Sequence, residues 1–242
     1  MSPRDPALWR ALLARESGRA LTAPLALAAI AAVGYARRAA HAAAVDAAAP
    51  PMRLRFDSIV LLLVTVVLVL RIATRAEADR ASGWVEPVVA AGGSRLRYGL
   101  AITASVWCSS ALVFMAAAAT FALALPVFGA SVEPLRTLLR TIGGGILLLA
   151  VYAVHAGCIG VLLRRSVPAI VVAGTIVVAP YALMTRALLR GDRIEWWLLA
   201  LTHVVPPVAL PSAADVLPLL GQVGAGTALL AWISHHFAAR RT

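Results

Sequence analysis

The sequence predicts an all-α integral membrane protein, and three observations point to this fold class. Of the 242 residues, 61% are hydrophobic and only 14% are charged, whereas a soluble domain carries about 25% charged residues. The mean hydropathy is +0.86. Several apolar runs reach the ~17–25 residues that cross a bilayer as a helix. A soluble, alanine-rich helical bundle is the alternative, but residues 58–70 and 98–125 offer no polar face to water.

The apolar runs predict six transmembrane helices within a single domain, residues 1–242. We expect Pro126 to end the third span and the pairs Arg164-Arg165 and Arg240-Arg241 to end the fourth and the last. For the first span a cleavable signal peptide is an alternative, because a short apolar stretch precedes A-x-A patterns. The expected spans are residues 21–40, 56–74, 98–125, 138–163, 167–188 and 216–239.

Two further segments are apolar without spanning the membrane. Residues 5–20 place Leu8, Trp9, Leu12 and Leu13 on one helical face among arginines, which predicts an N-terminal interfacial amphipathic helix. Residues 196–211 are too short to span and carry three prolines. Broken backbone at membrane depth is tolerated when it is buried in protein or lines a cavity. We therefore expect a re-entrant segment before the last span.

The arginines predict the orientation of the chain. With the N-terminus inside, thirteen arginines lie on the inner side of the six spans and nine on the outer side. Cytoplasmic loops carry the excess of positive charge, so both termini are expected in the cytoplasm. This places a multi-pass protein in the inner, or plasma, membrane. Arg37, Arg38, Arg53 and Arg55 run against the bias.

The composition also excludes several kinds of chemistry. The net charge is +11, yet the chain contains no lysine. A Walker A site needs a lysine to reach the β- and γ-phosphates, so this chain is not expected to be an ATPase or another enzyme. Cys108 and Cys158 have no metal-ligand spacing, and the histidines form no triad by spacing. We expect no metal or other cofactor, and the arginines beside apolar segments indicate a membrane surface rather than nucleic acid.

The inner segment between the second and third spans, residues 75–97, carries the functional signal. It opens with the acidic residues Glu77 and Asp79. Apolar residues then recur at a helical spacing, and a Gly92-Gly93 break follows. The apolar ridge of this short helix consists of Trp84, Val85, Val88 and Val89. Such a ridge fits a groove on a partner protein, or it covers the ends of the chain's own helices.

This segment resembles the corresponding segment of the ABC-2 family of ABC transporter permeases. Gly83 and Glu86 match that family's Gly-x-x-Glu element, and Ser94 with Arg95 matches its Ser-Arg pair before the third span. Glu77 and Asp79 fit its acidic lead-in, whereas Trp84 stands where the family favours threonine. The interfacial helix, the six spans and the broken segment also fit the family's layout.

The resemblance implies that residues 75–97 are a coupling helix that docks on a separate ABC ATPase subunit. The site residues it implies are Glu77, Asp79, Gly83, Trp84, Glu86, Val88, Val89 and Arg95. ATP and Mg²⁺ would be bound by that partner, and its closure would drive alternating access and export. Six spans make half a transporter, so a second permease subunit, identical or different, is expected. The substrate stays open.

Other polar residues within the spans are weaker candidates. Tyr152 and His155 lie one turn apart in the fourth span, where they are candidates for a substrate path or for hydrogen-bonded packing. The third span holds several small hydroxyl residues, which we expect to allow close approach and to bond across helices. Gly143-Gly144-Gly145 predicts close packing or flexibility. Two alternatives to a permease remain: a membrane scaffold subunit of a larger complex, and an autonomous channel or secondary transporter.

Overall fold

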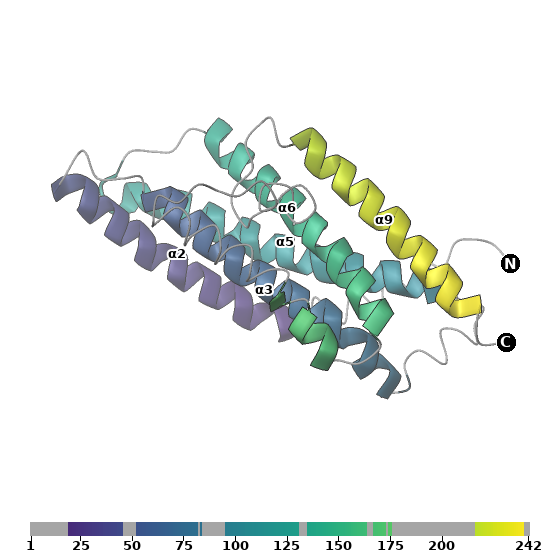
Figure 1. The fold of residues 1–242 in the computed structure, drawn as a ribbon. Coiled ribbons are helices and arrows are strands. Elements are labelled where there is room, and N and C mark those ends of the chain that lie inside the picture. Colours follow the sequence, from purple (N-terminus) through teal and green to yellow (C-terminus); the bar gives the residue numbers. More distant parts are fainter. Residues whose placement is uncertain are drawn as a thin grey trace, which may run out of the picture.

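The chain folds as a bundle of long helices (Figure 1). The computed structural model describes residues 19–45, 52–81, 83, 95–130, 135–163, 167–172, 174–175 and 216–239. These residues are almost entirely helical and contain no β-strand. The long helices are α2 (Arg19–Val45), α3 (Met52–Ala81), α5 (Arg95–Val127), α6 (Leu135–Leu163) and α9 (Val216–Ala239).

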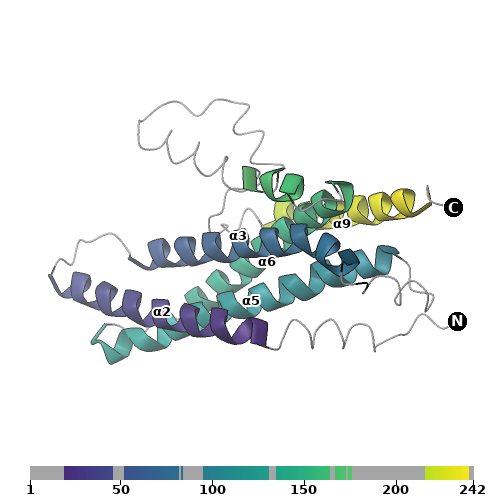
Figure 2. The same cartoon turned by 90° about the horizontal axis from the view of Figure 1, so that it is seen from below.

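The long helices run roughly along one axis, with α5 and α6 between the others (Figures 1 and 2). Helix α5 contacts α2, α3, α6 and α9, and α6 contacts α3, α5 and α9. Helices α3 and α6 end at the same end of the bundle where α5 begins (Figure 1). We call this the inner end, and the opposite one the outer end. The central position of α5 and α6 means that any displacement of one of them must be shared with its neighbours.

Four described helices are long and apolar enough to cross a membrane, which makes this a multi-span helical membrane protein. The corresponding segments are Ile59–Asp79, Tyr98–Val127, Leu135–Leu163 and Val216–Ser234. The expected first span falls on α2, which is continuous over 27 residues, or about 40 Å. Helix α2 carries Arg37 and Arg38 in its second half and is not among these four.

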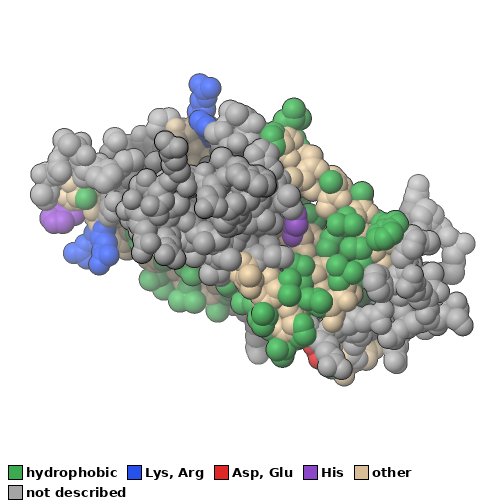
Figure 3. Space-filling view, viewed as in Figure 1, with side chains coloured by type: hydrophobic (Ala, Val, Ile, Leu, Met, Phe, Trp, Pro, Cys, Tyr) green, Lys and Arg blue, Asp and Glu red, His purple; other side chains and the backbone are tan. Residues whose placement is uncertain are grey.

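The surface of the bundle is apolar where a lipid-facing surface is expected. Hydrophobic side chains gather over α2 and α9 (Figure 3). The most exposed of them are Leu27 and Ile30 on α2 and Leu217, Leu220 and Trp232 on α9. In water such patches would favour aggregation, but in a bilayer they contact acyl chains.

Several predicted boundaries hold and others shift outward. The last span coincides with α9, and α6 ends at Leu163 as expected. Helix α3 continues past the expected Thr74 to Ala81, because Ala76 and Ala78 favour helix and Arg75 pairs with Asp79 one turn later. The residues first assigned to the start of the inner loop are therefore the last turns of α3.

The prediction that Pro126 ends the third span is wrong by two residues. Helix α5 includes Pro126 and runs to Val127. It ends in a Schellman motif, in which the Ala130 N–H donates to the Leu125 carbonyl and the Gly129 N–H donates to the Pro126 carbonyl, each at 3.1 Å. Gly129 has φ +81°, which only glycine adopts readily, so Gly129 rather than Pro126 terminates the helix.

Three predicted segments lie wholly or largely outside the described residues. They are the interfacial helix at 5–20, the re-entrant segment at 196–211 and the fifth span at 167–188. Of the last, residues 167–172 and 174–175 are helical.

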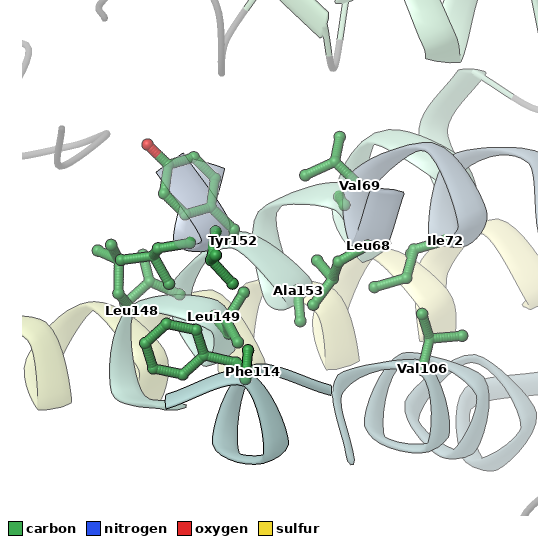
Figure 4. Packing of buried hydrophobic residues seen from close by; sticks show 14 of the residues in the cluster. Leu68, Val69, Ile72, Val106, Phe114, Leu148, Leu149, Tyr152 and Ala153 are labelled. Atoms are coloured by element: carbon green, nitrogen blue, oxygen red, sulfur yellow. The ribbon is translucent and has the colours of Figure 1, made fainter. Parts of the chain in front are cut away.

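The core of the bundle joins α3, α5 and α6. Leu68, Val69 and Ile72 of α3 form one buried cluster with Val106 and Phe114 of α5 and a run of α6 side chains, and Ile72 points toward Val106 in Figure 4. The α6 residues labelled there are Leu148, Leu149, Tyr152 and Ala153. Between residues 151 and 158 nearly every position of α6 is buried, which makes α6 the most enclosed helix described.

Glycines set how closely α6 approaches its neighbours. A Cβ added at Gly145 would lie 2.1 Å from Cε1 of Phe114, and one at Gly226 of α9 would lie 2.6 Å from Cγ2 of Val154. At Gly160 the nearest atom is the backbone carbonyl oxygen of Ile72, at 3.4 Å from the added Cβ. The expectation of close packing is thus met at Gly145, whereas a Cβ at Gly143 would meet nothing within 4 Å.

We expect Gly145→Ala to lower the thermal stability of the purified protein, because its methyl group would overlap the Phe114 ring. Overpacking of this kind costs about 1–3 kcal/mol. Gly143→Ala is the matched control and should be neutral or slightly stabilising, since alanine favours helix by about 1 kcal/mol over glycine. Adding Phe114→Leu to Gly145→Ala should recover part of the loss. Equal unfolding temperatures for the two alanine variants in detergent would contradict this packing.

Candidate functional site

The expected coupling segment begins and ends on two adjacent helices of the bundle. Residues 75–81 form the end of α3, and Arg95 begins α5. Gly83 is exposed and has φ +69°, so it turns the chain just after α3 in a conformation that favours glycine. The remaining predicted docking residues Trp84, Glu86, Val88 and Val89 lie outside the described residues, so their docking role stays a prediction.

The two acidic residues of the lead-in occupy different environments. Glu77 is exposed, whereas the Asp79 side chain is fully buried. The Tyr98 hydroxyl of α5 donates a hydrogen bond to Oδ2 of Asp79. Arg75 Nε lies 3.4 Å from Oδ1 of the same carboxylate. Asp79 therefore could not contact another protein without leaving these partners, whereas Glu77 lies at the surface of the bundle.

The cluster of Arg75, Asp79 and Tyr98 forms because helix geometry places Arg75 beside Asp79, and helix packing brings Tyr98 to them. Residues four apart on a helix are neighbours, which places Arg75 against Asp79 on α3. Tyr98 lies in the first turn of α5, which packs against α3. A carboxylate removed from water needs compensating hydrogen bonds and charge, and Tyr98 and Arg75 provide both.

Sequence reasoning used Tyr98 only as the first residue of a span and missed its partner. One signal was present: a tyrosine opens an apolar helix at the same membrane boundary where a carboxylate closes the preceding one. Interfacial tyrosines are common, however, so the pattern alone does not identify the pair.

Tyr152 and His155 lie on the same helix but in different surroundings. The Tyr152 ring is buried, and its hydroxyl points away from Leu148, Leu149 and Phe114 (Figure 4). His155 is partly buried, and its Nδ1 lies 2.7 Å from the Val151 carbonyl oxygen. This bond stays within α6, which fits the packing interpretation of the pair, while the partial exposure of His155 leaves the substrate-path interpretation open.

The expectation that hydroxyl groups of the third span bond across helices is wrong for three of them. Thr103, Ser105 and Ser109 each donate to a carbonyl of α5 itself, at 2.9 Å. Short side chains reach a carbonyl three or four residues back more easily than a neighbouring helix. They still permit close approach, because a Cβ at Gly157 of α6 would lie 2.8 Å from Oγ1 of Thr103.

Two bonds that the sequence did not predict join the helices instead. Trp107 Nε1 donates to the Ile146 carbonyl at 3.1 Å, which links α5 to α6. The Cys158 thiol lies 3.8 Å from the Gly226 carbonyl of α9. Both acceptors are backbone carbonyls, so no residue type marks them in the sequence.

The described residues contain no group of three histidine, cysteine, aspartate or glutamate side chains that could hold a metal ion. Cys108 and Cys158 are both free thiols.

No protein-family model matches this chain, and no curated protein matches it.

We expect Asp79→Asn to lower the free energy of unfolding much more than Glu77→Gln. Asp79→Asn removes a buried charge that Arg75 and Tyr98 both contact, and hydrogen bonds to charged groups contribute about 1.5–3 kcal/mol. Glu77→Gln changes an exposed side chain and should stay within about 0.5 kcal/mol of the parent. Chemical unfolding of both variants in the same detergent measures the difference. Equal free energies of unfolding would contradict the buried position of Asp79.

Proposed function

We propose that this chain is the membrane-spanning permease subunit of an ABC exporter of the ABC-2 type. Its partner is a separate ATPase subunit that docks on the 75–97 segment and drives alternating access. In this proposal the chain has six spans and both termini in the cytoplasm of the cell whose inner membrane it crosses. Two permease subunits and two ATPase subunits form the working unit.

The observation that carries the proposal is the position of the 75–97 motif. Asp79 and Tyr98 are in contact, so the segment that holds Gly83, Glu86 and the apolar ridge starts and finishes at one point of the inner end. A docking element needs ends that are anchored to the helices. A force applied to an element with unanchored ends would displace the connecting chain without moving the spans. The helices that anchor these ends, α3 and α5, both contact α6.

The composition also supports a membrane subunit that works with a separate ATPase. Without lysine the chain has no Walker A site, so an ATP-driven machine built with it requires a second polypeptide. The four apolar helices supply a membrane domain for such a partner to act on. An autonomous ion-coupled transporter is less favoured, because the carboxylates within the four span segments, Glu77 and Asp79, both lie at the inner end of α3, and Asp79 is engaged by Tyr98 and Arg75.

Affinity purification of the tagged full chain in mild detergent tests the class of partner. A co-purifying protein with a Walker A motif, whose ATP hydrolysis changes when the chain is added back in proteoliposomes, supports the proposal. Enzyme or respiratory subunits without such an ATPase would support a membrane scaffold instead.

We expect the ridge variant Val88→Ser/Val89→Ser to lose binding of this ATPase and stimulation of its hydrolysis, while membrane insertion stays intact. Serine removes the apolar contact that would fill a groove on the partner, and truncating such an anchor costs about 2 kcal/mol or more. Glu86→Gln should weaken the same contact. The control is Val127→Ser, which changes an exposed valine at the outer end of α5. Full binding and stimulation with the ridge variant would overturn the docking assignment.

We expect His155→Cys to react with a small, charged, membrane-impermeant thiol reagent in vesicles if this histidine lines a substrate path. The background carries Cys108→Ser and Cys158→Ser, and Val151→Cys, at a fully buried position, is the control. Intramembrane ionisable residues usually face a hydrated cavity or the bundle interior, so a rate at least about tenfold above that of Val151→Cys is expected. Equal slow rates would remove His155 from the path.

A further inference from the structure

The Asp79 carboxylate joins two helices at the point where the chain leaves one and enters the other. The span segment of α3 ends at Asp79, and that of α5 begins at Tyr98. These residues are nineteen positions apart in the sequence, yet the tyrosine hydroxyl donates directly to the carboxylate. One side-chain contact therefore holds together the two ends of the segment between Asp79 and Tyr98, which includes the turn at Gly83.

The burial of this contact makes it more than a surface ion pair. Asp79 and Tyr98 are both buried, and the Arg75 side chain is about one-fifth exposed. Exposed ion pairs contribute little because water competes for both charges. The Asp79 carboxylate is shielded from water, so breaking its contacts would leave an uncompensated negative charge in an apolar site. The contact should therefore persist through motions that would separate an exposed pair.

We propose that Arg75, Asp79 and Tyr98 form a latch that fixes the base of the 82–97 segment and makes the inner ends of α3 and α5 move as one unit. In the complex proposed above, on which this role in transmission rests, the latch converts movement of the docked segment into joint displacement of the two helices. Tyr98 is then a positioning residue that touches neither the partner nor a substrate. Asp79 acts through the latch and not as a docking contact.

Hydrogen–deuterium exchange on the full chain in detergent tests the latch without any partner. Tyr98→Phe keeps the ring and removes only the donor hydroxyl. Exchange of amides in residues 80–97 should rise about tenfold, as expected for losing one hydrogen bond to a charged group, while α6 is unchanged. The control is Ser109→Ala, which removes a buried hydroxyl that bonds within its own helix. It should leave exchange at 80–97 unchanged.

A second measurement tests transmission in the complex with the co-purified ATPase. Tyr98→Phe should bind that ATPase normally but lose most of its stimulation, whereas the ridge variant loses binding itself. Joining Asp79→Cys to Tyr98→Cys with a short bis-methanethiosulfonate linker, in the background without Cys108 and Cys158, should restore stimulation. A merely stabilising role would instead lower the unfolding temperature without a selective rise in exchange at 80–97.

The outcomes separate the two proposals. Unchanged exchange at 80–97 in Tyr98→Phe overturns the latch, whether or not an ATPase is found. Raised exchange with unchanged stimulation overturns its role in transmission. If no ATPase co-purifies, the proposed function fails, and the exchange data alone decide whether α3 and α5 are held together by this contact.

Discussion

The close approach of α6 to three other helices is the constraint on which the rest of this structure depends. Within a bilayer, lipid tails are as apolar as leucine, so helices gain little from hiding apolar surface and associate through close packing instead. Gly145 meets α5, and Gly157 meets α5 and α9, at distances where a Cβ would overlap or crowd its neighbour, and a Cβ at Gly160 would be in van der Waals contact with α3. Larger side chains there would push α6 away from its neighbouring helices and loosen the core that its Leu148 and Leu149 form with them.

The inner end of the bundle follows a different rule. There α3 and α5 are held together by one buried carboxylate with a phenol and a guanidinium around it. Close packing acts over the whole length of a helix pair and tolerates sliding. A hydrogen bond to a buried charge acts at one point and tolerates none. The combination leaves α3 and α5 fixed to each other at the inner end, while their contacts with α6 consist of apolar packing together with the Trp107 bond to the Ile146 carbonyl.

Composition and hydropathy were enough to predict the fold class and most helix positions, because a 30 Å hydrocarbon layer imposes length and polarity directly on the sequence. The range predicted for the last span, 216–239, coincides with helix α9, whose span segment is Val216–Ser234. The predicted helix ends were wrong where a local contact extended the helix beyond its apolar stretch. Helix α3 runs on past Thr74 with its Arg75–Asp79 pair, and α5 passes Pro126 to end at Gly129.

The site was predictable only in part, and the reason is geometric. Residue type and spacing identified 75–97 as the segment of interest, but Glu77 and Asp79 look alike in the sequence. Their difference depends on which side of α3 faces α5, and a two-residue interval turns a side chain by about 200° around a helix. The hydroxyl residues of α5 show the same limit, since Ser105 and Ser109 choose their own helix's carbonyls over a neighbour's.

The two kinds of contact together determine where this bundle can change shape. Helix α9 meets α6 through Gly226 against Val154 and a weak thiol bond from Cys158, contacts that permit small shifts along the helix axis. Helix α5 is held to α6 by the Trp107 bond and to α3 by the Asp79 contact. A load applied between α3 and α5 would therefore meet its stiffest resistance at the Asp79 contact, where hydrogen bonds to a buried charge hold the two helices together. The rocking motion that the proposed permease role requires would then carry α3 and α5 as one body, with the Trp107 bond linking α6 to them.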